Sequence, residues 1–206
     1  MVEIIEGVHA IDFSEEGGAG MELWILDCPE GTVLVDTGMR ELAIERIEAE
    51  LSSIGKTWSD IKKILITHRH GDHISNLKRA HELTGAEVLS HEDEAEALEE
   101  KGVEVTRLKH GQVLPYCGGI EVIHVPGHSE GNACYYLASK KAIIGGDTIF
   151  GDEEGNLNPP PERYCLDVEQ AEREIKRLLD YDFDVLLITH GKDVTEDAKK
   201  KVAALC

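Results

Sequence analysis

The chain has 206 residues, with 41 acidic and 21 basic side chains, so its formal net charge is −20 when histidine is counted as neutral. Hydrophobic residues make up 41% of it, which excludes collagen-like and strongly disordered proteins. The length predicts one domain over residues 1–206, because domains commonly hold about 150 residues. The acidic balance argues against a nucleic-acid partner, since phosphate binding depends on Lys and Arg.

Hydropathy and the start of the chain predict a cytoplasmic protein with no membrane partner. No run approaches the roughly 18 consecutive apolar residues of a membrane span. The first residues, Met1 to Glu6, include acids where a secretory signal has bases. The five cysteines are scattered, odd in number and never spaced as Cys-x-x-Cys, a pattern that predicts no disulfide framework.

The first half of the chain predicts a hairpin followed by alternating helices and strands. Apolar and β-branched residues at 22–27 and 32–36 flank a Pro-Gly turn, which is typical of a β-hairpin. The apolar spacing over 40–52 predicts an amphipathic helix, and the run at 62–67 predicts a buried strand. Three further elements are expected after it: a helix over 74–84, a strand over 87–89 and an acidic helix over 92–101.

The second half repeats this plan. A strand is expected over 120–125, then paired strands over 133–138 and 141–145, a helix over 167–179, a strand over 184–188 and a final helix from Thr195. Between them, Gly151 to Tyr164 contains three consecutive prolines and predicts an irregular surface loop that could cover a site. Arg163 and Tyr164 are its polar candidates for substrate contact, or for anchoring the loop.

The two halves also echo one another in where polar residues fall. In the first half, T-V-L-V ends in Asp36 and I-L-I-T ends in His68. In the second half, A-I-I-G-G ends in Asp147 and L-L-I-T ends in His190. Two hairpin, helix and strand units packed face to face predict an α/β fold, with a sheet-on-sheet core and helices outside. Ligand sites commonly lie beyond the carboxyl ends of strands, so these side chains are expected to gather there.

The segment 67–73, T-H-R-H-G-D-H, carries the densest set of metal-binding side chains. His68 and His70, two residues apart in a loop, can turn toward one point, while Asp72 and His73 can face a second point. Imidazole and carboxylate ligands suit zinc, iron and manganese, and the lack of cysteine argues against a closed structural zinc site. Three more candidates follow predicted strands beside glycine: His128, Asp147 and His190.

Together these motifs resemble those of the metallo-β-lactamase superfamily: H-x-H-x-D-H, a His after Pro-Gly, an Asp after Gly-Gly, a last His after an apolar strand, and an early Asp-Thr-Gly. The resemblance implies a four-layer αβ/βα sandwich of two mixed β-sheets flanked by helices. It also implies two divalent metal ions, with zinc favoured and iron or manganese as alternatives. The implied roles are His68, His70 and His128 on the first metal, Asp72, His73 and His190 on the second, Asp147 between them, and Asp36 orienting a ligand imidazole.

The activity that the resemblance implies is hydrolysis of a small ester, thioester or related substrate by a hydroxide held between the metals. Asp72 and Asp147 are the candidate catalytic residues, with Asp72 able to pass a proton. The compact group around hydroxyacylglutathione hydrolase, glyoxalase II, is the most similar, although the chain lacks the length for that enzyme's helical C-terminal region. The expected partner is a small molecule, and a homodimer is common among similar proteins.

Several alternatives stay open or are disfavoured by particular residues. His70 stands where flavin-linked members usually have Glu, and Phe150 stands where acyl-homoserine lactonases have Tyr. A tRNA-processing nuclease is disfavoured by the charge of −20, and a resistance β-lactamase often has Cys in place of Asp147. Phosphodiesterase, phosphotriesterase or β-lactamase-type activity on the same site remains an alternative. A non-catalytic metal-binding protein is disfavoured because every ligand position is intact.

Overall fold

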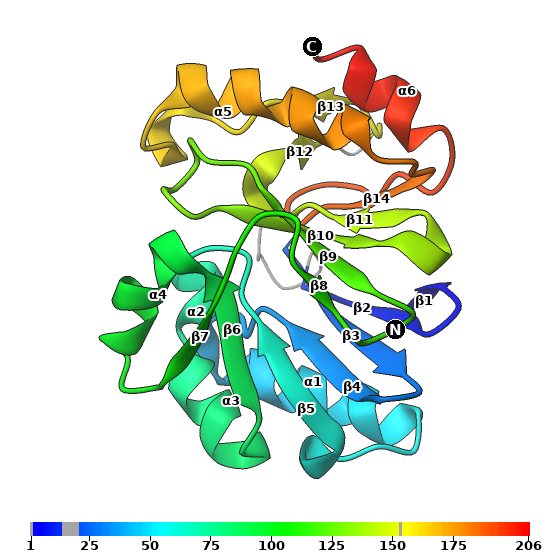
Figure 1. Ribbon diagram of the computed structural model, residues 1–206. Coiled ribbons are helices and arrows are strands. Elements are labelled where there is room, and N and C mark those ends of the chain that lie inside the picture. Colours follow the sequence, from blue (N-terminus) through cyan, green and yellow to red (C-terminus); the bar gives the residue numbers. More distant parts are fainter. Residues whose placement is uncertain (1, 14–20, 153) are drawn as a thin grey trace.

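Two β-sheets face one another at the centre of the structure, and helices cover their outer faces (Figure 1). The computed structural model describes residues 2–13, 21–152 and 154–206. The layers follow the order helix, sheet, sheet, helix, as the motifs and the internal echo predict.

The first sheet is built from the first half of the chain. Its seven strands lie in chain order: β1 (Val2–Ile5), β2 (Val8–Asp12), β3 (Glu22–Cys28), β4 (Gly31–Val35), β5 (Ile61–Leu65), β6 (Glu87–His91) and β7 (Val105–Leu108). The strands from β1 to β4 pair antiparallel, and those from β4 to β7 pair parallel. Because parallel strands run in one direction, β4 to β7 all end at the same edge of the sheet.

The second sheet is built from the second half. Its five strands lie in the order β14 (Val185–Leu187), β11 (Ala142–Ile144), β10 (Ala133–Leu137), β9 (Ile120–His124) and β8 (Val113–Leu114). Only the β11 and β14 pair is parallel among these neighbours. Both sheets are therefore mixed. The predicted repeat is confirmed, since β3, β4 and β5 correspond in order and direction to β10, β11 and β14.

Three hydrophobic clusters hold the layers together. The cluster between the sheets includes the fully buried Trp24 and Tyr135. A second, around Ile47 and Leu98, lies between the first sheet and α1 (Arg40–Ser53), α3 (Leu77–Thr84) and α4 (Glu92–Glu99). A third, around Leu178, lies between the second sheet and α5 (Val168–Glu174), the 3₁₀ helix Ile175–Asp180 and α6 (Ala198–Ala203). Over the described ranges, each helix is too short or too polar to cross a membrane.

The segment predicted as an irregular loop, Gly151 to Tyr164, contains short regular elements, so that prediction was wrong. The strands β12 (Phe150–Gly151) and β13 (Leu157–Asn158) form a two-stranded antiparallel hairpin, and Glu162–Tyr164 forms a 3₁₀ turn. The prolines at 159–161 follow β13 and therefore do not interrupt its pairing.

Other differences concern element ends and short strands. The helix predicted over 74–84 is broken at Asn76, whose backbone N–H donates to Gly38 O and whose amide donates to Thr37 O and Arg40 O. The helix predicted over 167–179 tightens to a 3₁₀ helix at Ile175, and the last helix begins three residues later than predicted. The sequence pattern missed β1, β2, β7 and β8, which are short strands near sheet edges.

Cys28 and Cys117 form a disulfide, contrary to the prediction from cysteine spacing. Cys28 ends β3, and Cys117 lies between β8 and β9, so the bond joins the two sheets. Cys28 pairs with Gly31 at the start of β4, which places the disulfide at the edge opposite the ends of the parallel strands. The spacing rule failed because the partners are 89 positions apart and meet only when the sheets pack together.

Candidate metal centre

All seven predicted metal ligands lie at one edge of the sandwich, beyond the carboxyl ends of strands. His68 and His70 follow β5, and Asp72 and His73 lie in the short helix α2 (Gly71–Ile74) directly after them. The second sheet contributes three residues that follow β9, β11 and β14 respectively: His128, Asp147 and His190. The two sheets thus supply opposite walls of a single polar cluster.

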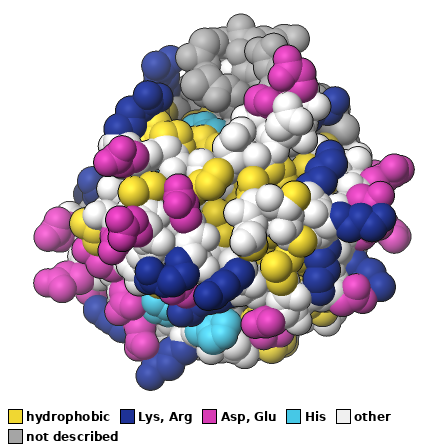
Figure 2. Space-filling view, turned by 90° about the horizontal axis from the view of Figure 1, so that it is seen from above, with side chains coloured by type: hydrophobic (Ala, Val, Ile, Leu, Met, Phe, Trp, Pro, Cys, Tyr) yellow, Lys and Arg dark blue, Asp and Glu magenta, His cyan; other side chains and the backbone are white. Residues whose placement is uncertain are grey.

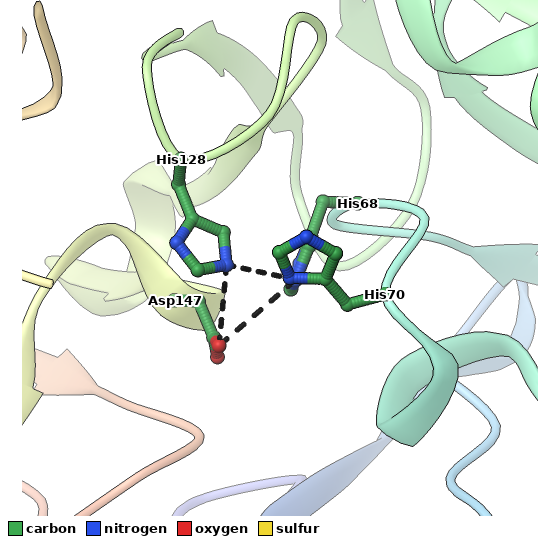
Figure 3. A group of neighbouring side chains, drawn as sticks. All are labelled: His68, His70, His128 and Asp147. Carbon is green, nitrogen blue, oxygen red and sulfur yellow. Dashed lines mark hydrogen bonds and ion pairs between the residues drawn. The ribbon is translucent and has the colours of Figure 1, made fainter. Parts of the chain in front are cut away.

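The first group of donors comprises His68, His70, His128 and Asp147, whose ligand atoms lie within 4.8 Å of one another. Figure 3 shows these side chains pointing toward a common space from three separate loops. His128 Nε2 is 3.1 Å from His68 Nε2 and 3.4 Å from Asp147 Oδ2. The planes of the three imidazoles are nearly perpendicular to one another, at 72° to 81°. Such rings can aim their in-plane lone pairs at one point.

The second group comprises Asp72, His73, Asp147 and His190, again within 4.8 Å. His190 Nε2 is 3.3 Å from Asp72 Oδ2, and His73 Nε2 is 3.2 Å from Asp147 Oδ1. Asp147 belongs to both groups, and its side chain is only 4% exposed. One carboxylate is therefore placed to serve two cations.

Among the described residues, two buried atoms in this cluster, His73 Nε2 and Asp147 Oδ1, form no hydrogen bond of good geometry, although they lie 3.2 Å apart. Unpaired buried polar atoms are costly unless an ion or water satisfies them. A divalent cation beside them would remove that cost, and imidazole with carboxylate is a donor set that zinc, iron and manganese accept. The residues present therefore fit metal binding.

Asp36 is placed to orient His73. Its Oδ2 lies 2.8 Å from His73 Nδ1, which turns Nε2 of that ring toward Asp147. Thr67 fixes the carboxylate by donating from its backbone N–H at 2.8 Å and from its hydroxyl at 2.7 Å. Asp36 itself has a left-handed backbone with φ of 61°, which turns the chain sharply after β4. The role of Thr67 was missed, although Thr-His recurs at 189–190.

The residues of this cluster shift one another's pKa values. Burial and the neighbouring His73 hold the pKa of His68 well below its usual value, and burial with His128 lowers the pKa of His70 to about 4. Burial opposes the charged form of His73, but Asp147 and Asp36 raise its pKa well above the usual value. Burial likewise opposes charge on Asp147, yet His73 holds its pKa well below the usual range. A cation on His73 Nε2 would therefore compete with a proton on that ring.

The predicted substrate residues, Arg163 and Tyr164, do not belong to this cluster. Both side chains are exposed, and the guanidinium of Arg163 lies 4.6 Å from the centre of the Tyr164 ring. Three further residues that the sequence pattern did not assign touch the ligand loops: Phe150, Cys165 and Glu94. Buried Glu94 accepts hydrogen bonds from Ser129 Oγ and Gly131 N, which ties α4 to the loop after His128.

His91 and His124 form a separate cluster with Asp93. Their rings are stacked, with centroids 3.7 Å apart and planes at 14°. In-plane lone pairs of parallel rings do not converge on one cation, unlike those of the perpendicular rings around Asp147. As arranged, this pair joins the ends of β6 and β9 as a structural contact.

A half-buried acid pair, Glu22 and Asp193, lies near the His190 loop. The carboxyl groups of Glu22 and Asp193 share a hydrogen bond. Burial, with repulsion from Asp193, raises the pKa of Glu22, and burial raises the pKa of Asp193. A carboxyl whose folded pKa is raised stabilises the fold at low pH, and that stability is lost as pH rises toward the folded pKa. Between pH 5 and pH 8.5, we expect the free energy of unfolding of the wild type to fall by about 1–3 kcal/mol more than that of Glu22→Gln.

Urea unfolding of both proteins across that pH range measures this difference. Glu87, which pairs with Lys63 on the first sheet, offers a matched control. The Glu87→Gln variant should show the same slope of unfolding free energy against pH as the wild type in this range. Parallel curves for wild type and Glu22→Gln would contradict the prediction.

The fold places two groups of metal-binding donors between the edges of the two sheets. The sequence profile of the metallo-beta-lactamase superfamily matches residues 24–190. The chain therefore belongs to the metallo-β-lactamase superfamily, and the predicted family and fold are confirmed.

Two curated relatives have names that describe hydrolases. A hydroxyacylglutathione hydrolase of Rhizobium meliloti (strain 1021) is 30% identical over 133 residues, which cover 64% of this chain and 44% of that protein. A probable metallo-hydrolase of Bacillus subtilis (strain 168) is 28% identical over 160 residues, which cover 71% of this chain and 70% of that protein. The chain thus spans less than half the length of the first relative.

Solved structures show the same fold. A metallo-beta-lactamase family protein from Thermus thermophilus superposes with a TM-score of 0.79 at 22% identity, over 98% of this chain and 79% of that one. BJP-1, a subclass B3 metallo-beta-lactamase of Bradyrhizobium japonicum, superposes with a TM-score of 0.70 at 22% identity, over 92% and 76%. At these identities the likeness concerns the fold alone.

Proposed function

We propose that the chain is a hydrolase that uses two divalent metal ions to cleave a small ester or thioester. The observation that carries this proposal is the shared carboxylate: Asp147 lies within 4.8 Å of three donors on one side and three on the other. Two metal ions in such a pair supply an activated water and polarise the substrate oxygen. Zinc is the favoured metal, with iron or manganese as alternatives, because all three accept imidazole and carboxylate donors.

The residues of the chain have distinct parts in this proposal. His68, His70 and His128 would hold one ion with Asp147, and Asp72, His73 and His190 would hold the other with the same carboxylate. Asp36 keeps His73 in the orientation that its ligation needs. The Asp72 side chain, at 31% exposed, is far more open than that of Asp147 at 4%. Asp72 is therefore the carboxylate placed to exchange a proton with a substrate or with solvent.

A thioester of the kind cleaved by glyoxalase II is the favoured substrate. Its support is the similarity to the hydroxyacylglutathione hydrolase of Rhizobium meliloti, which is greater in identity than the likeness to the β-lactamase structures. The proposed partner is a small molecule, with no nucleic acid or membrane, and a homodimer is compatible with it. On the face seen in Figure 2, over α5 and α6, both acidic and basic side chains surround hydrophobic ones. A continuous basic stripe would be typical of nucleic-acid binding.

The proposal also places the enzyme in the cytoplasm. The Cys28 to Cys117 disulfide is unusual for that compartment, except in hyperthermophilic organisms, whose intracellular proteins are often rich in disulfides. Cytoplasmic location and the oxidised bond are therefore compatible for a heat-adapted source.

A panel of four substrates tests the proposed function: a glutathione thioester, a lactone, a bis-aryl phosphodiester and a β-lactam. We expect the thioester to be hydrolysed fastest, with activity lost on chelation and restored by zinc. Faster phosphodiester or β-lactam cleavage would reassign the substrate while keeping the metal centre. Cleavage of a precursor tRNA at moderate salt would overturn the small-molecule proposal. Absence of turnover by protein loaded with two metals would favour a non-catalytic role.

A further inference from the structure

The described part of segment 150–167, here called the brace, contacts a ligand loop at each of its ends. At its first end, the Phe150 ring stacks on the His190 ring, with centroids 5.0 Å apart and planes at 20°. Gly151 N donates to His190 O at 2.8 Å. Gly191 has φ of 121°, and a Cβ there would collide with the Gly151 carbonyl. The hairpin therefore lies against the His190 loop at a distance that only glycine permits.

At its other end, the brace is bonded to the loop of His128. Leu166 N donates to His128 O at 3.1 Å, and Asp167 N donates to Gly127 O at 2.9 Å. Cys165 Sγ lies 3.8 Å from His128 Nδ1 and 3.5 Å from Pro161 O. When His128 ligates through Nε2, its Nδ1 carries a proton that can be donated to this sulfur, while the thiol proton is donated to Pro161 O. The directions of both hydrogen bonds are thus consistent with metal binding.

The ligand histidines differ in the groups that contact the side of each imidazole facing away from the donor cluster. Asp36 Oδ2 is 2.8 Å from His73 Nδ1, and the Thr67 hydroxyl is 3.2 Å from His68 Nδ1. The His190 ring stacks on Phe150, and its Nε2 faces Asp72. The Nδ1 of His128 faces the Cys165 thiol, and Phe150 touches the His128 ring only at a tilt of 50°, with centroids 6.4 Å apart. Groups that orient a ligand ring commonly control metal affinity by about 10- to 100-fold.

We propose that Phe150 and Cys165 are positioning residues, each setting the imidazole plane of one metal ligand, and that the brace is a fixed support of the metal centre. Phe150 acts on His190 and so on the group that contains Asp72. Cys165 acts on His128 and so on the group that contains His70. This inference rests on the proposed pair of metal ions and is independent of the substrate. Both ends of the segment are bonded to ligand loops.

The test is a titration of the metal-free protein with Co²⁺ alone, which yields two stepwise dissociation constants. Asp72→Asn removes a donor of one group only and so identifies which step belongs to that group. We expect Phe150→Leu to raise the dissociation constant of that step by about 10-fold or more, while Phe150→Tyr, which keeps the aromatic face, restores it. Cys165→Ala is expected to raise the other constant by a similar factor, and Cys165→Ser to restore part of the loss.

Cys206→Ala, at an exposed cysteine on the last residue of the chain, is the matched control and should change neither constant. The proposal fails if both variants weaken the two steps equally, or if neither constant moves. Circular dichroism checks folding, and Phe150→Ala and Cys165→Val replace any variant that does not fold. Wild-type protein that binds fewer than two Co²⁺ ions would instead overturn the proposed dinuclear centre, so the two failures are distinguishable.

Discussion

Asp147→Asn is expected to lower kcat/KM by about 10³-fold or more, because losing roughly 4 kcal/mol of transition-state stabilisation costs three powers of ten. The substitution keeps the side-chain shape but removes the negative charge that both donor groups share. It also removes the carboxylate that stabilises the charged form of His73 in the metal-free protein. We therefore expect fewer than two metal ions per chain after loading, measured by elemental analysis beside the initial rate.

Asp60→Asn is the matched control, because the half-buried Asp60 caps a turn through Thr57 before β5, away from the ligand edge. It should retain both ions and the full rate. An Asp147→Asn protein that keeps two metals and a rate within tenfold of wild type would refute the role given to this carboxylate. Unfolding curves for both variants separate loss of metal from loss of fold.

Breaking the Cys28 to Cys117 disulfide is expected to cost about 4 kcal/mol of folding free energy. The bond closes a loop between positions 89 apart, and its main effect is to restrict the unfolded chain, with larger loops giving larger effects. Reduced wild type and the Cys28→Ser, Cys117→Ser double variant should have the same lowered free energy of unfolding in urea. Metal content should be unchanged, because the disulfide lies at the opposite edge from the donors.

A thiol count provides the control for this experiment. Denatured wild-type protein should react as three thiols, Cys134, Cys165 and Cys206, and as five after reduction. Cys134→Ser is unsuitable as a comparison because that thiol is buried against Thr148. Five reactive thiols without reductant, or an unfolding free energy that reduction leaves unchanged, would contradict the prediction.

The sequence predicted the fold and the ligand set where the signal was local. The H-x-H-x-D-H run places four donors within six positions, and repeated apolar runs ending in Asp or His mark the strand ends. The family resemblance implied that Asp36 orients a ligand imidazole, and in the structure its carboxylate lies 2.8 Å from His73 Nδ1. Such patterns can be recognised in the sequence because each depends on a single turn of the chain or on the end of a single strand.

What escaped prediction depends on contacts between distant segments. The Cys28 to Cys117 pair requires two sheets to meet, and the stacking of Phe150 on His190 requires a hairpin to dock on another loop. Proline content suggested an irregular segment, yet β12 and β13 pair because their residues precede the prolines. Strands β1 and β2 are too short to give a clear period; β2 pairs with β3, and β1 pairs with β2.

The division of donors between the sheets has a mechanical consequence. Each group takes side chains from both halves of the chain, with His68 and His73 on one side and His128 and His190 on the other. An ion in either group would therefore crosslink the two sheets as well as serve chemistry. With the disulfide at the far edge, the sandwich would be fastened along both borders, by a covalent bond at one and by coordination at the other.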